Sequence, residues 1–234
     1  MADSGNSTAL LSNHVLAALR PDARDFIVDR SEMRHMNTGD VIYANGALVT
    51  HLVFPLEGVV SFIADPASNK NVEKASVGPE GFLGFALIMD SDKALGTSVV
   101  QVPGRALWLS TTDFDQALER FRCLRASMLR YAKALIMQLM ESVACSSLHT
   151  AEQRVSRWLL QAHDRVAGDE FQVTQETISQ LLALRRATVN AACSDLMNAG
   201  AISYNRGRMI VKDRKVLHAR CCPCYDRIRM ATAC

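Results

Sequence analysis

The chain is poor in aromatic residues, and cysteine is missing from its first half. Phe, Trp and Tyr make up 6% of the 234 residues, and residues 1–122 contain no Cys. All seven Cys lie further along the chain. An odd number of Cys fits free thiols in a reducing compartment better than a disulfide scaffold. The composition therefore argues against a small disulfide-linked protein.

Features of export and membrane insertion are also missing. No Lys or Arg precedes Arg20, and the first residues contain no apolar stretch. The apolar stretch Gly81–Met89 is far too short to cross a bilayer, which takes about 20 residues in a helix. We therefore expect no secretory signal, no membrane partner and a cytoplasmic location.

Motifs of the common enzyme classes are absent as well. The sequence has no nucleophile elbow, phosphate-binding loop, dinucleotide fingerprint or HExxH pair. We therefore predict no catalytic residues, no cofactor and no enzymatic activity. No spacing typical of a metal site is visible among His14, His35, His51, His149 and His163.

The balance of charge differs between the two parts of the chain. Residues 1–150 carry 13 Lys and Arg against 16 Asp and Glu, whereas residues 151–234 carry 13 against 8. The second part therefore has a net charge of +5 and is the candidate for binding a polyanion. Many solvated surfaces reach such a modest excess, so charge alone decides little. With 49% hydrophobic residues, the chain can form two unequal globular domains.

The first third of the chain predicts helices followed by many short strands. The segment His14–Met36 has helical spacing, and Pro21 divides it into two short helices. Beyond Thr38, short strand-forming runs alternate with turn residues, which predicts a compact antiparallel barrel or roll. The runs are Val41–Tyr43, Leu52–Phe54, Val59–Ile63, Ala75–Val77, Val99–Val102 and Ala106–Leu109.

A long helical pattern follows the N-cap residues Ser110–Asp113. Apolar residues recur every three or four positions from Phe114 to Val143, without Pro or Gly, and predict one helix of about thirty residues. A helix of this length is explained by pairing with its twin in a dimer. The alternative is burial along its own roll, and a second stripe through Ile136 and Met140 favours cover on both sides. The predicted dimer contacts are Leu124, Met128, Tyr131, Leu135 and Leu139.

The segment Thr174–Ala192 is the most informative part of the chain. Leu182 and Leu184 cannot lie on the same face of one helix, so the helical phase must break near Ala183. Two short helices joined by a tight turn restore a shared core. A further helix, His149–Val166, is expected to pack against this unit. The sequence therefore predicts a helix-turn-helix.

The second of these helices presents polar and basic residues near its N-terminus. This end enters the major groove of DNA in helix-turn-helix proteins. Arg186 can donate two hydrogen bonds to guanine, and Asn190 can pair with adenine. Thr174, at the N-cap of the first helix, and Gln175 are placed for a phosphate contact.

A basic hairpin follows the helix stop Ala199-Gly200. The runs Ile202–Tyr204 and Met209–Val211 flank Asn205–Arg208, which predicts a wing that lies along the DNA backbone. The alternative is a small α+β subdomain with a solvated basic face. The phase break, helix stop and hairpin occur in the order of a winged helix-turn-helix. The predicted DNA contacts are Thr174, Gln175, Arg185, Arg186, Thr188, Asn190, Arg206 and Arg208.

Over residues 14–213 the chain resembles the Crp/Fnr family of bacterial transcription regulators. The resemblance rests on GPEGFLG at Gly78–Gly84, on the long helix, and on VTQETISQLLALRRATVNAACSDLMNAGAI followed by the wing. It implies an α+β fold: an antiparallel β-roll of the cyclic-nucleotide-binding type in residues 1–112, a dimerisation helix in 113–146, and a winged helix-turn-helix domain with a C-terminal extension in 147–234. It also implies a homodimer on a pseudo-palindromic site in double-stranded DNA, an effector-sensing roll and contact with RNA polymerase.

The chain departs from the family pattern at its ligand sites. Cyclic-AMP-binding members have a Glu after the Gly of the phosphate cassette and a later Arg-Ser pair, where this chain has Phe85 and Gly96-Thr97. An anionic phosphate would meet no matched cation there. Oxygen-sensing members hold an iron–sulfur cluster with N-terminal Cys, which this chain lacks. We expect an uncharged or aromatic effector, if any, in a pocket formed by Phe82, Leu83, Phe85, Gly96 and Thr97.

The recognition helix also departs from the family. Arg186 matches the family's base-reading Arg, whereas Ala187 and Ala191 stand where an acidic reader and a later Arg are usual. The operator is therefore expected to differ from the best-known consensus.

Cysteines gather near the C-terminus, where a helix is predicted over Lys215–Met230. The spacing of His218, Cys221, Cys222 and Cys224, with Cys234 at the end, is not that of a standard zinc pair. We interpret these residues as reduced thiols, with Cys221, Cys222 and Cys224 as weak candidates for metal binding. Alternative functions are a regulator gated by the redox or metal state of these Cys, a ligand-gated adaptor without DNA binding, and a small-molecule-binding enzyme.

Overall fold

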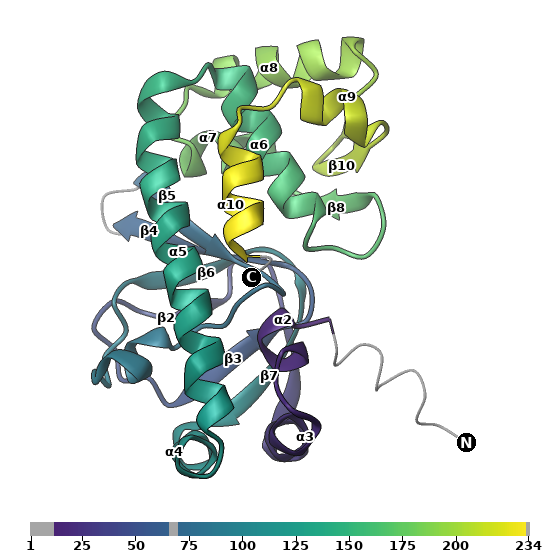
Figure 1. Cartoon of the computed structure of the whole chain (residues 1–234). Helices are drawn as coiled ribbons and strands as arrows, with labels where there is room; N and C mark the ends of the chain where they lie inside the picture. The colour runs from purple at the N-terminus through teal and green to yellow at the C-terminus, as the bar shows by residue number, and fades with distance from the viewer. Residues whose placement is uncertain (1–11, 66–69, 233–234) are drawn as a thin grey trace.

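A computed structural model describes residues 12–65 and 70–232 of the chain. It has three parts (Figure 1): a roll of antiparallel strands, a long helix that runs beside it, and a helical unit with a small sheet beyond the roll. This α+β architecture confirms the predicted fold class. None of the helices in the described part of the chain is long and apolar enough to cross a membrane.

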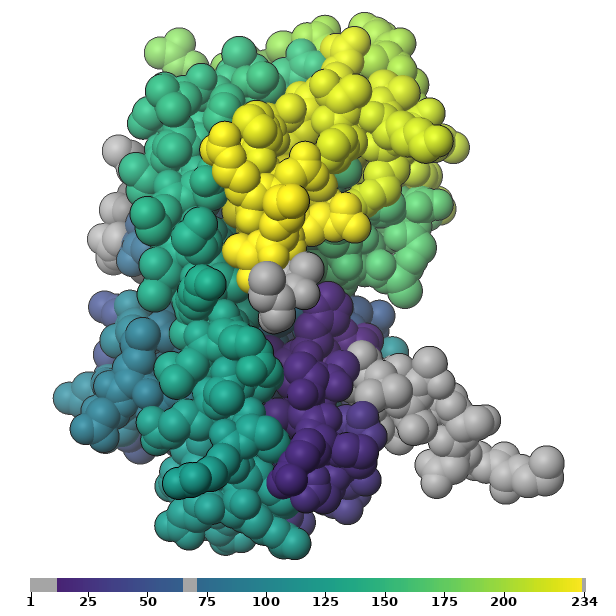
Figure 2. All heavy atoms as spheres, viewed as in Figure 1, coloured from purple at the N-terminus to yellow at the C-terminus, as the bar shows by residue number. Residues whose placement is uncertain are grey.

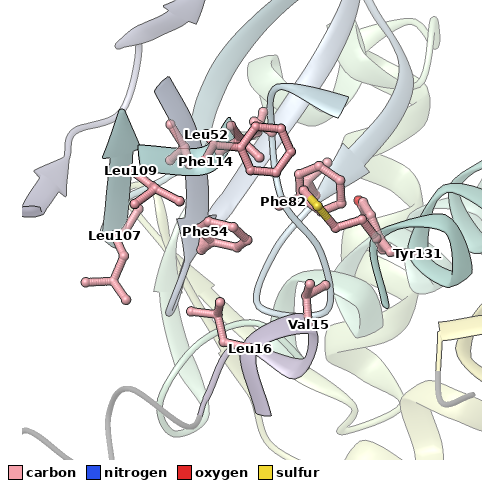
Figure 3. Close-up of a cluster of buried hydrophobic side chains, with 14 of the residues drawn as sticks. Val15, Leu16, Leu52, Phe54, Phe82, Leu107, Leu109, Phe114 and Tyr131 are labelled. Carbon is pink, nitrogen blue, oxygen red and sulfur yellow. The ribbon is translucent and has the colours of Figure 1, made fainter. Parts of the chain in front are cut away.

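The roll consists of two antiparallel sheets. The strand orders are β2-β6-β4-β5 and β1-β7-β3. The strands are β1 Glu32–Met36, β2 Val41–Tyr43, β3 His51–Pro55, β4 Val59–Asp65, β5 Lys70–Val77, β6 Thr97–Val102 and β7 Gly104–Ser110. All six predicted runs therefore form strands. Their inward residues, with α2 His14–Ala17 and α3 Pro21–Arg30, enclose a core around Phe54, Phe82 and Phe114 (Figure 3).

The helical prediction for the N-terminal segment is wrong beyond Arg30. Residues Glu32–Met36 form β1, which pairs with β7 from Glu32 opposite Trp108 to Met36 opposite Gly104. Only Met36 of this strand is fully buried, so the run lacks the apolar alternation that identifies a strand. A short 3-10 helix, η2 Phe85–Met89, was also not predicted.

The predicted thirty-residue helix is two helices. Helix α4 spans Thr111–Arg120, and the long helix α5 spans Arg122–Leu148. Ser110 caps α4 by accepting from the amide of Asp113, as predicted. Phe121 has extended backbone angles between the helices, and its ring packs edge-on against Phe26 of α3. The break between α4 and α5 therefore coincides with burial of this ring against α3. The spacing of the apolar residues along the sequence does not show this break.

The roll buries the side of α5 that was predicted to form the dimer contact. Leu124, Met128, Tyr131 and Leu135 belong to the core of the same chain. The structure therefore contradicts their assignment to a dimer interface, because all four side chains are buried within their own chain, at most 6% exposed. Of the predicted contacts, only Leu139 is exposed. A second apolar stripe of α5 is exposed and consists of Leu129, Ile136, Met140 and Val143.

The last part of the chain is a unit of helices around a small sheet of strand order β8-β10-β9. Its elements are α6 Ala151–His163, β8 Glu170–Gln172, α7 Gln175–Leu181, α8 Arg186–Asn198, β9 Ile202–Asn205, β10 Arg208–Val211, α9 Arg214–Ala219 and α10 Cys224–Thr232. The predicted single C-terminal helix is wrong, since Arg220 ends α9 and Pro223 precedes α10. Helix α10 runs back along α5 (Figure 1).

Candidate nucleic-acid interface

Helices α7 and α8 form the predicted helix-turn-helix. The Thr174 hydroxyl accepts from the amide of Thr177 and caps α7. The chain then reverses through Ala183, whose φ of 51° lies in the left-handed region, and the Leu184 amide donates to the Ser179 carbonyl. The break that the apolar spacing predicts near Ala183 is therefore confirmed.

A shared core holds the two helices together. Ile178 and Leu182 of the first helix and turn meet Val189 and Leu196 of α8, and all four are buried. Trp158 of α6 belongs to the same cluster, so α6 supports the pair as expected. This packing fixes which side of α8 faces solvent.

The outward side of α8 carries the polar residues singled out in the sequence. Arg185, Arg186, Thr188 and Asn190 are all exposed. Arg186 has 74% of its side chain exposed, and its contact with Glu176 is a loose ion pair of 3.8 Å. Surface pairs of this kind contribute little energy, so the guanidinium can turn to another partner. Nothing in the described part of the chain covers this face.

The wing is a tight hairpin with a basic tip. Strands β9 and β10 pair with Asn205 opposite Arg208, which leaves Arg206 and Gly207 as a two-residue turn. Both turn residues have positive φ, 48° and 84°, as in a type I′ turn. The Arg206 side chain is exposed, whereas Arg208 pairs with Glu170 of β8. That third strand was not predicted from the sequence.

The wing is tied to the first helix of the motif. The Gln175 amide lies 3.4 Å from the hydroxyl of Tyr204 in β9. Gln175 also bonds the buried thiol of Cys193, whose pKa is raised to about 11 by burial. Thr174 and Gln175 thus sit where α7, α8 and the wing meet.

Comparison with known proteins identifies this arrangement. Residues 153–220 match the family model of the Crp-like helix-turn-helix domain. FixK2 from Bradyrhizobium japonicum superposes with a TM-score of 0.67 at 15% identity, over 82% of this chain and 98% of that one. TTHB099, a CRP-family transcriptional regulator from Thermus thermophilus, gives 0.64 at 20% identity, over 80% and 95%. The chain therefore has the Crp/Fnr fold.

A third match is the c-di-GMP-responsive global regulator CLP from Xanthomonas campestris. Its TM-score is 0.61 at 14% identity, over 83% of this chain and 100% of that one. No curated protein matches the sequence. The resemblance to the Crp/Fnr family that the sequence predicts is confirmed by the helix-turn-helix match together with the fold.

In this Crp/Fnr fold a cavity of about 300 Å³ lies between the roll and α5. Phe85 and Gly96 line it, as predicted, together with Phe62, Lys74 and Leu135. The structure does not bring the other predicted pocket residues to it: Phe82 and Leu83 are fully buried in the core, and Thr97 bonds the Asn45 amide. Lys74, a cation in the wall, was missed because only the fold brings it beside α5.

The junction between the roll and the helix-turn-helix unit contains a buried ion pair that was also missed. Arg165, just after α6, donates to both carboxylate oxygens of Glu80 in the GPEGFLG stretch, at 2.7 and 3.2 Å. It also bonds the hydroxyl and carbonyl of Ser76. The side chains of Arg165 and Glu80 are only 6% and 12% exposed. In this Crp/Fnr fold the stretch therefore anchors the last part of the chain.

The structure places the described C-terminal cysteines near the end of α5 and His218 away from them. Cys222 and Cys224 are buried beside Cys145 and His149 of the α5 end, whereas Cys221 points its sulfur at the Cys222 carbonyl. The hydrogen bond with Cys222 and burial raise the pKa of Cys145 to about 12. His218 lies elsewhere, bonded to Asp226. Cys234 lies outside the described residues.

Proposed function

We propose that the protein is a sequence-specific DNA-binding transcription regulator of the Crp/Fnr type that acts as a homodimer. The observation that supports this most directly is the exposed face of α8. Four polar or basic side chains are exposed there, next to a wing with a basic tip. A helix presented in this way fits the major groove of duplex DNA.

Each residue of this face has a chemical role in the proposal. Arg186 is the reader of guanine, since its guanidinium can donate two parallel hydrogen bonds to one base edge. Asn190, one turn further along α8, is placed for adenine. Thr188 and Arg185 complete the groove contacts. Thr174, Gln175, Arg206 and Arg208 contact phosphates and set the register.

The homodimer is proposed to form through the exposed stripe of α5. Leu129, Ile136 and Val143 are seven residues apart, and Met140 lies on the same side. This is the heptad spacing of paired helices. Two copies joined along α5 would present two recognition helices to a pseudo-palindromic operator, whose half-sites lie about 34 Å apart.

The remaining roles follow from the same proposal. A regulator of this type acts where the chromosome lies, in the cytoplasm, and contacts RNA polymerase; catalysis forms no part of this function. The cavity of Phe62, Phe85 and Leu135 is the proposed effector site. Its wall is apolar except for Lys74 and contains no Arg. This lining favours an apolar or aromatic ligand over a cyclic nucleotide held by an Arg.

Selection from random duplex DNA tests the proposal. Purified protein should enrich one pseudo-palindromic sequence, equally with and without cyclic AMP, and binding should weaken steeply with salt. Binding that does not change with salt, or no enrichment of any duplex, would contradict it and favour an adaptor without DNA binding.

The substitution Arg186→Ala then tests the proposed contact between Arg186 and a guanine. We expect a loss of about 1–3 kcal/mol on the selected site and relaxed preference at one position of it. Arg20→Ala is the control, because Arg20 is also exposed with a loose acidic neighbour at 3.4 Å but lies on the roll. Equal losses on selected and random DNA would show that Arg186 contacts only the backbone.

A further inference from the structure

Four potential metal ligands meet where the C-terminal segment crosses the end of α5. Cys145 and His149 are four residues apart on one face of the helix end, and Cys222 and Cys224 flank Pro223 before and at the start of α10. Their ligand atoms all lie within 4.8 Å of one another. Figure 2 shows the C-terminal segment, in yellow, lying against α5, in teal.

Two of the separations between these atoms match one tetrahedral ion, and none exceeds 4.8 Å. With Zn–S of about 2.3 Å and Zn–N of about 2.0 Å, a tetrahedral site separates two sulfurs by about 3.8 Å and a sulfur from a nitrogen by about 3.5 Å. The sulfurs of Cys145 and Cys222 are 3.5 Å apart, and the Cys224 sulfur is 3.6 Å from Nδ1 of His149. An iron–sulfur cluster needs ligands spread around a core of several iron and sulfide ions, whereas these four ligand atoms lie close enough together to surround a single ion.

Burial makes the site closed. The three Cys side chains are buried and His149 is half-buried, so the protein supplies all four positions. Catalytic zinc sites keep one position for water or substrate, whereas structural sites have four protein ligands of this kind.

Two arginines near the cluster provide matching charge. Zn²⁺ with three thiolates and a neutral imidazole carries about one negative charge. Arg154 and Arg157 interact electrostatically with Cys145, and Arg157 is buried with no hydrogen-bond partner for Nε. Neither forms an ion pair within the described residues, whereas Glu141, which also hydrogen-bonds the Cys224 thiol, pairs with Arg227 at 3.2 Å. A buried cation, Arg157, and a half-buried one, Arg154, both without a carboxylate partner, suit an anionic neighbour.

We propose that Cys145, His149, Cys222 and Cys224 bind a Zn²⁺ ion in a closed tetrahedral site. Coordination releases the three thiol protons to solvent and needs no oxidant. A disulfide between Cys145 and Cys222 is the competing chemistry; it would need an external oxidant and would bring the sulfurs to about 2.05 Å. The four ligand positions explain the whole cluster, whereas a disulfide uses only two.

The site joins elements that are far apart in sequence. Cys145 and Cys222 are 77 residues apart, and His149 directly precedes the Thr150 cap of α6. The ion would therefore fasten α10 to the joint between α5 and the helix-turn-helix unit. On the proposed DNA-binding function, its loss should weaken operator binding by changing how that unit is held.

Metal content of the full-length protein tests the site. After expression with zinc and purification in the presence of a reductant, we expect about one zinc per chain by mass spectrometry of the metal. Cobalt(II) added to metal-free protein should give the strong visible bands of a tetrahedral site and sulfur-to-cobalt charge transfer. Both readouts are independent of DNA, so a failure here is distinct from a failure of the proposed function.

Matched variants locate the ion. Cys145→Ser and Cys222→Ser should each lower zinc affinity by more than about 100-fold, the upper effect of losing an outer-shell partner. His149→Ala leaves the three buried thiols in place, so it should keep the sulfur-to-cobalt charge transfer but shift the visible bands and bind zinc more weakly. Cys221→Ser is the control, because its sulfur bonds the Cys222 carbonyl and, although it packs against the cluster, is not one of the four ligand atoms that lie together; it should retain full zinc content.

Three outcomes would overturn the proposal. They are reduced wild-type protein without zinc or a cobalt spectrum, equal loss of zinc in Cys221→Ser and Cys145→Ser, or a Cys145–Cys222 disulfide in protein purified with reductant. Circular dichroism of each variant separates loss of a ligand from loss of the fold. If a variant does not fold, the zinc content and cobalt spectrum of the wild-type protein decide the question.

Discussion

The ion pair of Arg165 and Glu80 gives a quantitative test of how the two parts of the molecule are joined. Glu80→Gln keeps the shape of the side chain and one acceptor but removes the negative charge. Arg165 would remain buried, with its two bonds to Ser76 and only the charge of Glu73, to which it has no direct bond, to balance it. Removing one partner of a buried pair costs about 3–5 kcal/mol. Because the amide retains one acceptor, we expect about 3 kcal/mol less free energy of unfolding.

A second ion pair supplies the control. Glu57 bonds Arg105 at 2.7 Å, but their side chains are 30% and 37% exposed. Glu57→Gln should therefore cost no more than about 1 kcal/mol, as solvent-exposed pairs do. The two substitutions make the same chemical change at similar distance and differ in burial.

Urea unfolding followed by tryptophan fluorescence and circular dichroism measures both variants. Trp108 lies in β7 of the roll and Trp158 in α6, so the two tryptophans report both parts. Equal small losses in Glu80→Gln and Glu57→Gln would refute the reasoning, because they would show that water reaches Arg165. The double variant Glu80→Leu with Arg165→Met should recover most of the loss, since it leaves no buried charge.

Three further predictions follow from single positions. Ala183→Gly should raise the free energy of unfolding by about 0.5–1 kcal/mol in thermal unfolding, because Ala183 has a φ of 51°. Ala191→Gly, inside α8, should lower the free energy of unfolding by about 1 kcal/mol. Changes of the same sign in both variants would contradict the prediction. Gly81→Ala should cost about 1–3 kcal/mol, because a Cβ there would lie 2.0 Å from Cζ of Tyr131; Gly96→Ala, with its nearest neighbour at 4.0 Å, should be neutral, and similar losses would refute the packing. Met140→Lys should give monomers in analytical ultracentrifugation without loss of helix, whereas Gln116→Lys on α4 should leave the dimer intact. A Met140→Lys protein that stays dimeric would exclude the exposed stripe of α5 as the dimer interface.

Local patterns predicted the elements well where the chemistry was local. The break at Ala183 follows from Leu182 and Leu184, which cannot share a helix face. The hairpin follows from Arg206-Gly207 between two short runs. Strand β1 was missed because Glu32, Arg34 and His35 are polar and the pairing with β7 decides their state.

Contacts between distant segments could not be predicted. The stripe of Leu124 to Leu135 has the same spacing whether it faces a partner or its own roll, and only packing distinguishes the two. Glu80 and Arg165 are 85 residues apart, and Cys145 and Cys222 are 77 apart. No spacing rule connects such positions. The sequence therefore pointed to the GPEGFLG stretch and to the C-terminal Cys, but not to their partners Arg165 and Cys145.

The hydrophobic cluster behind α8 has a consequence for engineering. Val59, Ile63 and Val102 of the roll are members of the same buried cluster as Trp158 and Ile178. Cutting the chain near Thr150 would leave this apolar surface bare on both fragments. The DNA-reading unit is therefore not a portable module: a chimaera that transplants it onto a foreign sensor must also carry matching residues at the edges of β4 and β6.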